Sequence, residues 1–185
     1  MDIFETSKEW KNKADILIKE KEIVSDLAEF GEVYFTGAYS YDLMMHGDID
    51  ISIVRQEGYS IEEVFEIFRT LYFKGSFRSY FIGGDWDDPR KGSEFPDGHY
   101  IGLKEKINGE RWKLDLWFLN SDEYKKRSND SNVISMNKEQ RKLVLECKKY
   151  RNDNKISITG QEIYTGVIEA KIKKAEDLKS IVKQK

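Results

Sequence analysis

Apolar residues along the chain recur with two periods, one typical of helices and one typical of strands. Over residues 9–30 and 61–73 they fall at three- and four-residue steps, which predicts two amphipathic helices. Ser7 is the expected N-cap of the first helix, and Gly31 is expected to end it. Ser60 and Glu63 predict a capping box at the start of the second helix.

Five stretches have the short apolar or alternating pattern of strands: residues 33–36, 48–55, 77–82, 99–107 and 111–119. The last two flank Asn108-Gly109, a pair favoured where a tight turn needs positive φ, so we expect them to form a hairpin. Residues 83–96 hold both prolines of the chain and predict a long loop. In the last strand, alternation places Lys113, Asp115 and Trp117 on one face.

After residue 120 the pattern becomes helical, over residues 122–127, 137–151 and 160–185, the last with a break. The polar stretch 120–137 is the expected boundary between a sheet-bearing part and this helical part. The sequence therefore predicts an α+β fold, with a mixed sheet of about five strands, helices on one side and a C-terminal helical segment. We expect a catalytic domain over residues 1–120 and a helical segment over residues 121–185 packed on it.

Composition indicates the cellular compartment in which the protein works. No run of roughly 18 apolar residues is present, the first residues lack the apolar core of a signal peptide, and Cys147 is the single cysteine. These features indicate a cytoplasmic protein without a membrane partner, and a multi-cysteine zinc site is excluded. The sequence gives no indication of oligomeric state.

Charge is unevenly distributed along the chain. Residues 138–185 carry 13 Lys and Arg against 7 Asp and Glu, so a net charge of −3 for the whole chain leaves −9 for residues 1–137. An acidic body repels a long polyanion, whereas a basic tail attracts one. A small-molecule acceptor is therefore favoured over RNA or protein, neither of which is excluded.

Three aspartates are the candidate catalytic and metal-binding residues. Asp48 and Asp50 alternate with Ile49 and Ile51, so both carboxylates face the same side of a strand. Asp115 is a third acid on a later strand. Clustered carboxylates repel one another unless a cation lies between them, and Mg²⁺ prefers such oxygen ligands. An Asp-Ile-Asp sequence by itself is also common on half-exposed strands.

A turn of small residues precedes the paired acids. Nine residues separate Gly37-Ala38 from Asp48. Backbone N–H groups exposed at such a turn can bind phosphate, and the Ser40 hydroxyl can add a further contact. Together with Lys113, these residues are the candidate substrate-binding set.

The order glycine turn, spacer, Asp-x-Asp and later acid resembles the nucleotidyltransferase superfamily, which includes DNA polymerase beta, poly(A) polymerases and aminoglycoside nucleotidyltransferases. The resemblance covers residues 31–120 and rests on Gly37-Ala38, Asp48-Ile49-Asp50 and Asp115. Ala38 stands where the family usually has Ser or Gly, so a hydroxyl that would contact the nucleotide phosphates is missing.

The resemblance implies transfer of a nucleoside monophosphate from a nucleoside triphosphate to an acceptor hydroxyl, with two Mg²⁺ ions, or Mn²⁺ in their place. It implies that Asp48 and Asp50 bind both ions and that Asp115 binds one and acts as general base. Two alternatives stay open. The first, supported by Ala38, is a catalytically inactive member that serves as a binding or regulatory protein. The second is a glycosyltransferase that uses Asp48 and Asp50 to hold a metal-bound sugar nucleotide.

Overall fold

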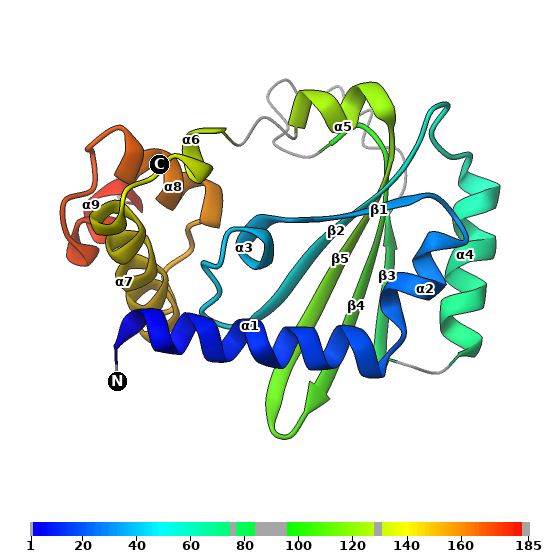
Figure 1. Ribbon diagram of the computed structural model, residues 1–185, viewed down its shortest axis with the longest axis horizontal. Coiled ribbons are helices and arrows are strands. Elements are labelled where there is room, and N and C mark those ends of the chain that lie inside the picture. The colour runs from blue at the N-terminus through cyan, green and yellow to red at the C-terminus, as the bar shows by residue number, and fades with distance from the viewer. Residues whose placement is uncertain (1, 75–76, 84–95, 128–130, 183–185) are drawn as a thin grey trace.

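The computed structural model describes residues 2–74, 77–83, 96–127 and 131–182. The first part of the chain contains both helices and strands, and the described residues after the last strand form helices and their connections (Figure 1). In chain order the elements are α1 (Ile3–Glu20), α2 (Ile23–Ala28), β1 (Glu32–Thr36), α3 (Gly37–Ser40), β2 (Gly47–Arg55), α4 (Ile61–Phe73), β3 (Ser79–Gly83), β4 (His99–Ile107), β5 (Glu110–Asn120), α5 (Ser121–Arg127), α6 (Ser131–Ile134), α7 (Lys138–Asn154), α8 (Gly160–Ile168), the 3₁₀ helix η1 (Ala175–Asp177) and α9 (Leu178–Val182).

The strands form one mixed sheet in the order β1-β2-β5-β4-β3. β2 and β5 are parallel, and the other neighbouring pairs are antiparallel. The predicted α+β class, with a five-stranded mixed sheet and a C-terminal helical segment, is confirmed. The predicted hairpin around Asn108-Gly109 joins β4 to β5. Residues 84–95 of the predicted loop lie outside the described residues.

The sheet has one apolar face and one polar face. Ile49 and Ile51 of β2 and Leu114 and Leu116 of β5 are fully buried in one cluster with residues of α1, α2 and α4. Burying each such side chain stabilises the fold by about 1.5–3 kcal/mol. In Figure 1, α1 runs across the lower end of the sheet and α4 stands beside it. Since side chains alternate along a strand, residues such as Asp115 belong to the opposite, polar face.

The N-terminal helix differs from its prediction. A single helix over residues 9–30 is wrong, because Glu22 has a left-handed backbone (φ 52°) that separates α1 from α2. The N-cap of α1 is Asp2, which accepts a hydrogen bond from the Phe4 N–H at 3.2 Å. Ser7, expected at the cap, is buried within α1 and donates its hydroxyl to the carbonyl of Asp42 at 2.9 Å.

The C-terminal helices enclose a second apolar cluster. Its buried residues come mostly from α7, α8 and the segments around them, and they include the single cysteine, Cys147. Leu43 and Met45, from the segment between α3 and β2, belong to this cluster, and Ile3 and Phe4 of α1 pack against it. α1 therefore contacts both clusters and connects the sheet to the helices (Figure 1).

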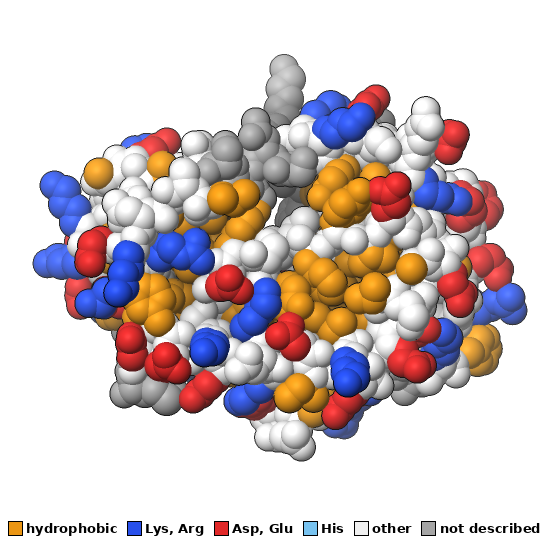
Figure 2. Space-filling model, viewed as in Figure 1, with side chains coloured by type: hydrophobic (Ala, Val, Ile, Leu, Met, Phe, Trp, Pro, Cys, Tyr) orange, Lys and Arg blue, Asp and Glu red, His pale blue; other side chains and the backbone are white. Residues whose placement is uncertain are grey.

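Basic side chains gather over the C-terminal helices on the left of Figure 2, as the charge asymmetry of the sequence indicated. None of the helices in the described part of the chain combines the length and apolar character that a bilayer span requires.

Candidate active site

The pairing of β2 with β5 brings the three candidate acids together. Asp50 lies directly opposite Asp115, and Asp48 lies opposite Lys113. Neighbouring strands are about 4.8 Å apart, so Asp50 and Asp115 are adjacent on the polar face. Asp48 is one step along the same face of β2.

Asp115 is the most enclosed of the acids, with 8% of its surface exposed. Its Oδ1 accepts a hydrogen bond from the Tyr100 hydroxyl at 2.5 Å, and its Oδ2 accepts one from Lys113 Nζ at 2.5 Å. Burial lowers the pKa of Lys113, but the hydrogen bond and charge of Asp115 outweigh it, so the pKa lies above its usual value. Burial and the bond to Asp115 raise the pKa of Tyr100. Both partners therefore stay protonated and donate to the carboxylate.

In the part of the chain that the structure describes, the other two acids have no such hydrogen-bond donors. Burial, together with the negative charges of Asp48 and Asp115, raises the pKa of Asp50 to about 8. Asp48 has one oxygen, Oδ1, that is buried and has no hydrogen-bond partner among the described residues. Its Oδ2 lies 3.6 Å from His46 Nε2. Buried carboxylate oxygens are normally satisfied, so an unpartnered one needs a reason.

The carboxylates do not form a finished metal site. Within the described residues, no three His, Cys, Asp or Glu side chains are gathered so that they could hold a metal ion. The contacts of the carboxylates give the physical reason: Asp115 is hydrogen-bonded to Tyr100 and Lys113, while Asp48 Oδ2 lies 3.6 Å from His46 Nε2. The residues present still fit a cation. Three carboxylates lie on one face of the sheet and repel one another, and among the described residues Asp48 Oδ1 has no hydrogen-bond partner.

The predicted glycine turn touches this site. Gly37 begins α3 with φ of +63°, and a Cβ added there would overlap Asp50 Oδ2 and lie 3.0 Å from Asp50 Cγ. Only glycine fits without displacing the acid. Ala38 is half-buried against the sheet core, and the Ser40 hydroxyl donates to the carbonyl of Gly37 at 3.0 Å. The structure thus brings Gly37 and Lys113 to the acids, whereas Ala38 faces the core.

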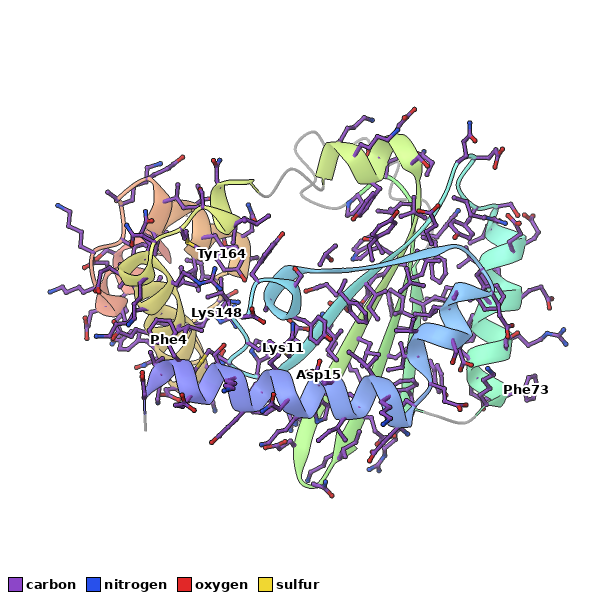
Figure 3. All side chains as sticks on the ribbon, in the orientation of Figure 1. Phe4, Lys11, Asp15, Phe73, Lys148 and Tyr164 are labelled. Carbon is purple, nitrogen blue, oxygen red and sulfur yellow. The ribbon has the colours of Figure 1, made fainter. Side chains whose placement is uncertain are left out.

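The segment between the turn and β2 is held by side chains from two helices. Ser7 and Lys11 of α1 and Arg141, Lys148 and Asn152 of α7 each donate to a backbone carbonyl in this segment. The acceptors are Asp42, Tyr39, Tyr41, Leu43 and Met45, respectively. Figure 3 shows Lys11 and Lys148 approaching the segment from opposite sides. Its shape depends on helices far away in the sequence.

Lys148 is the most buried of these donors, with 2% exposed. Its Nζ donates to the Leu43 carbonyl at 2.9 Å and to the Tyr164 hydroxyl at 2.6 Å (Figure 3). Burial and, to a smaller extent, the charge of Arg151 lower its pKa to about 7, while Asp48 and Asp50 act in the opposite direction.

Lys148→Met is expected to lower the free energy of unfolding by about 1–3 kcal/mol, because the Leu43 carbonyl loses its buried donor. Between pH 7 and 10.5 the unfolded chain binds more protons at this lysine than the folded chain does, so the wild type gains stability as pH rises. The loss should therefore be larger at pH 9 than at pH 7 in urea unfolding. Lys142→Met, at an exposed position of the same helix, should change stability by no more than about 0.5 kcal/mol. Equal losses in the two variants would contradict the role of Lys148.

Sequence reasoning missed Tyr100 and Lys148. A signal existed for each. In a hairpin that turns at Asn108-Gly109, Tyr100 falls opposite Trp117, on the face of Asp115. Lys148 follows the buried Val144 by four residues, so it belongs to the apolar face of its helix.

The sequence matches no family model and no curated protein. Solved structures do match. The polymerase core of TRAMP, an RNA surveillance complex, gives a TM-score of 0.56 at 17% identity, covering 91% of this chain and 54% of that one. The non-canonical poly(A) polymerase complex GLD-2–GLD-3 gives 0.52 at 14%, covering 89% and 57%.

The Cid1 poly(U) polymerase bound to Mg 3′-dATP gives a TM-score of 0.56 at 14% identity, covering 86% of this chain and 48% of that one. The chain thus spans about half the length of these structures. The three proteins are nucleotidyltransferases of one superfamily. Their likeness shows that this chain has the nucleotidyltransferase fold.

Proposed function

We propose that the protein transfers a nucleoside monophosphate from a nucleoside triphosphate to an acceptor hydroxyl, with pyrophosphate leaving. The fold supports nucleotidyl transfer in general. In this proposal Asp48 and Asp50 hold two divalent cations, Asp115 contributes to one of them, and the backbone of the turn Gly37-Ala38, together with Ser40 and Lys113, binds the triphosphate. Mg²⁺ is the expected ion, and Mn²⁺ is the alternative.

One observation carries the proposal: beside the Asp50–Asp115 pair, Asp48 has a buried oxygen that no described residue hydrogen-bonds. Burying unpaired carboxylates is costly, and a protein that needed only a stable sheet would place apolar or neutral residues there. A bound cation would satisfy the unpartnered oxygen and relieve the repulsion that raises the pKa of Asp50. The chemistry that such cations supply is neutralisation of charge on the phosphates and on the attacking and leaving oxygens.

In this proposal Asp115 is the general base. Its carboxylate would take the proton of the acceptor hydroxyl as that oxygen attacks the α-phosphorus. Oδ1 and Oδ2 are already hydrogen-bonded to Tyr100 and Lys113, so an acceptor hydroxyl must displace one donor or share its oxygen. Lys113 is the donor suited to move, because its side chain is 43% exposed and could then reach a phosphate. The Tyr100 hydroxyl would keep Asp115 oriented.

The division at residue 120 stays a proposal. The apolar cluster of the C-terminal helices supports a separate helical segment, although it includes Leu43 and Met45 from before that boundary. In this proposal the helical segment fixes the segment between the glycine turn and Asp48 through Arg141, Lys148 and Asn152.

Incubation with α-labelled triphosphates and Mg²⁺, over a panel of RNA, protein and small-molecule hydroxyl acceptors, tests the proposal. Labelled product and pyrophosphate should appear, and both should vanish in the double variant Asp48→Ala, Asp50→Ala. A Mg²⁺-dependent rise in melting temperature with triphosphate gives a readout besides turnover. Pyrophosphate release by the double variant would refute the assignment of Asp48 and Asp50 to the active site.

A catalytically inactive binding protein is the second candidate, favoured by one observation. Ala38 lies against the core, and the nearby Ser40 hydroxyl bonds back to Gly37, so neither supplies a hydroxyl that faces the acids. Tight triphosphate binding without transfer to any acceptor would support this candidate. A glycosyltransferase gains no support from the fold.

A further inference from the structure

The β4–β5 hairpin carries a group of basic residues on the polar face, directly beside Asp48. A groove of about 590 Å³ follows them, and we call it the hairpin groove. Its lining residues are His46, Gly47, Asp48, Arg78, Ser79, Lys104, Glu105, Lys106, Arg111, Trp112 and Lys113. Five of these are Lys or Arg and two are acidic, in a protein whose net charge is −3.

Strand pairing places four of the cations in two like-charge pairs. Lys104 lies opposite Lys113, and Lys106 lies opposite Arg111. Like charges directly opposite one another destabilise a sheet. Lys113 is compensated by Asp115, but Lys104, Lys106 and Arg111 are exposed and have no carboxylate within ion-pair distance in the described part of the chain. An anionic ligand would relieve this repulsion.

The basic surface continues past the acids. A second hollow of about 1000 Å³ shares His46 and Arg111 with the hairpin groove and is also lined by Arg151 and Lys155. The cations therefore extend over two adjoining hollows, from Arg78 just before β3 to Lys155 just after α7. Such a line of charge suits a chain of phosphates.

Aromatic rings lie on the other side of the acids on the same sheet face. Phe81, two residues after Ser79 of the groove, is 57% exposed. Its ring lies 5.9 Å from that of Tyr100, which lies 4.9 Å from that of Trp117. Of the three rings, Phe81 is the exposed one, and an exposed ring beside a basic groove suits a single strand, since a base stacks on the ring while cations follow the backbone. Inorganic polyphosphate has no bases that could stack on an aromatic ring.

We infer that the hairpin groove binds a single strand of nucleic acid and leads its terminal hydroxyl to Asp115. This inference rests on the proposed function and names its acceptor. It replaces the small-molecule acceptor favoured from the acidic body, because the average charge of residues 1–137 conceals a locally basic face.

Fluorescence anisotropy of the full chain with labelled 12-nucleotide RNA and DNA strands of one sequence tests the inference. Lys106→Glu with Arg111→Glu should weaken binding about tenfold or more and reduce the slope of log affinity against log salt by about 2. Lys8→Glu with Lys19→Glu changes the net charge equally on exposed positions of α1 and should have less than about a twofold effect. Phe81→Ala should weaken strand binding but not competition by inorganic polyphosphate. The RNA and DNA arms tell which sugar the groove prefers.

The inference would be overturned if the groove and α1 variants lost equal affinity for the strands. It would also be overturned if the wild type bound neither strand at low salt. So would a Phe81→Ala variant that binds strands as the wild type does, since the groove would then be a site for any polyanion. The Mg²⁺–triphosphate thermal shift, measured in the same variants, separates the two proposals. Strand binding through the hairpin without that shift would refute the proposed transfer alone, while the shift without groove-dependent strand binding would refute the nucleic-acid acceptor alone.

Discussion

Asp115→Asn is expected to reduce nucleotidyl transfer about 10²- to 10⁴-fold without lowering the melting temperature of the metal-free protein. The amide keeps the shape of the side chain and can still accept the Tyr100 hydrogen bond, but it cannot take a proton from the acceptor. It also removes one of the charges that raise the pKa of Asp50, which offsets the lost ion pair with Lys113. Single-turnover transfer at saturating triphosphate, with thermal melts in EDTA, measures both effects.

Asp15→Asn is the matched control. Asp15 also accepts a hydrogen bond from a tyrosine hydroxyl, that of Tyr39 at 2.7 Å, but it is exposed on α1 and outside the polar face. Transfer by this variant should stay within about twofold of the wild type, because only an exposed contact changes. If Asp115→Asn kept full activity, or lost activity only in proportion to a fall in melting temperature, Asp115 would be a structural residue.

The strand pattern predicted which face each acid occupies. Ile49 and Ile51 are fully buried, as are Leu114 and Leu116, so alternation correctly assigned Asp48, Asp50 and Asp115 to the other side. The tight turn of the predicted hairpin also sets the register of its two strands, and this register places Gly102 opposite Asp115.

The pairing of β2 with β5 could not be predicted from the periodicity of the sequence. The residue pattern within each strand does not show that Asp50 pairs with Asp115. This parallel pairing joins segments about 65 residues apart, and it depends on the crossover connection between the two strands. Only the resemblance to nucleotidyltransferases indicated it. The break at Glu22 was missed for a similar reason, since Ile23 and Leu27 turn onto the sheet core and that tertiary contact outweighs helix propensity.

The hydrogen bonds that shape the segment before β2 were also beyond sequence analysis. Ser7 was predicted to cap a helix, and Lys148 was counted only among the charges of the basic part over residues 138–185. Each instead reaches a backbone carbonyl at least 35 residues away. Buried carbonyls need donors, and which side chain supplies one is decided only when the helices pack.

Gly37→Ala is expected to lower the free energy of unfolding by about 3 kcal/mol or more and to reduce transfer at least about 100-fold. An alanine in the left-handed region costs about 1–2 kcal/mol by itself. Its Cβ would in addition overlap Asp50 Oδ2 and crowd Asp50 Cγ at 3.0 Å, which forces the carboxylate away from Asp115. A displacement of about 1 Å at a reacting group can cost 10²-fold in rate.

Gly109→Ala isolates the contact with Asp50 from the backbone cost. Gly109 has φ of +85° and nothing within 4 Å of an added Cβ, so its replacement should cost only about 1–2 kcal/mol. Combining Gly37→Ala with Asp50→Ala removes the overlapping carboxylate, so the pair should destabilise by less than the sum of the single changes in urea unfolding. If the effects of Gly37→Ala and Asp50→Ala were strictly additive, and Gly37→Ala and Gly109→Ala lowered the free energy of unfolding equally, an added Cβ at residue 37 would not displace Asp50. The family signature of a glycine before two aspartates would then reflect backbone conformation alone. A sub-additive pair would mean that the glycine is required because Asp50 occupies the space where any side chain would lie.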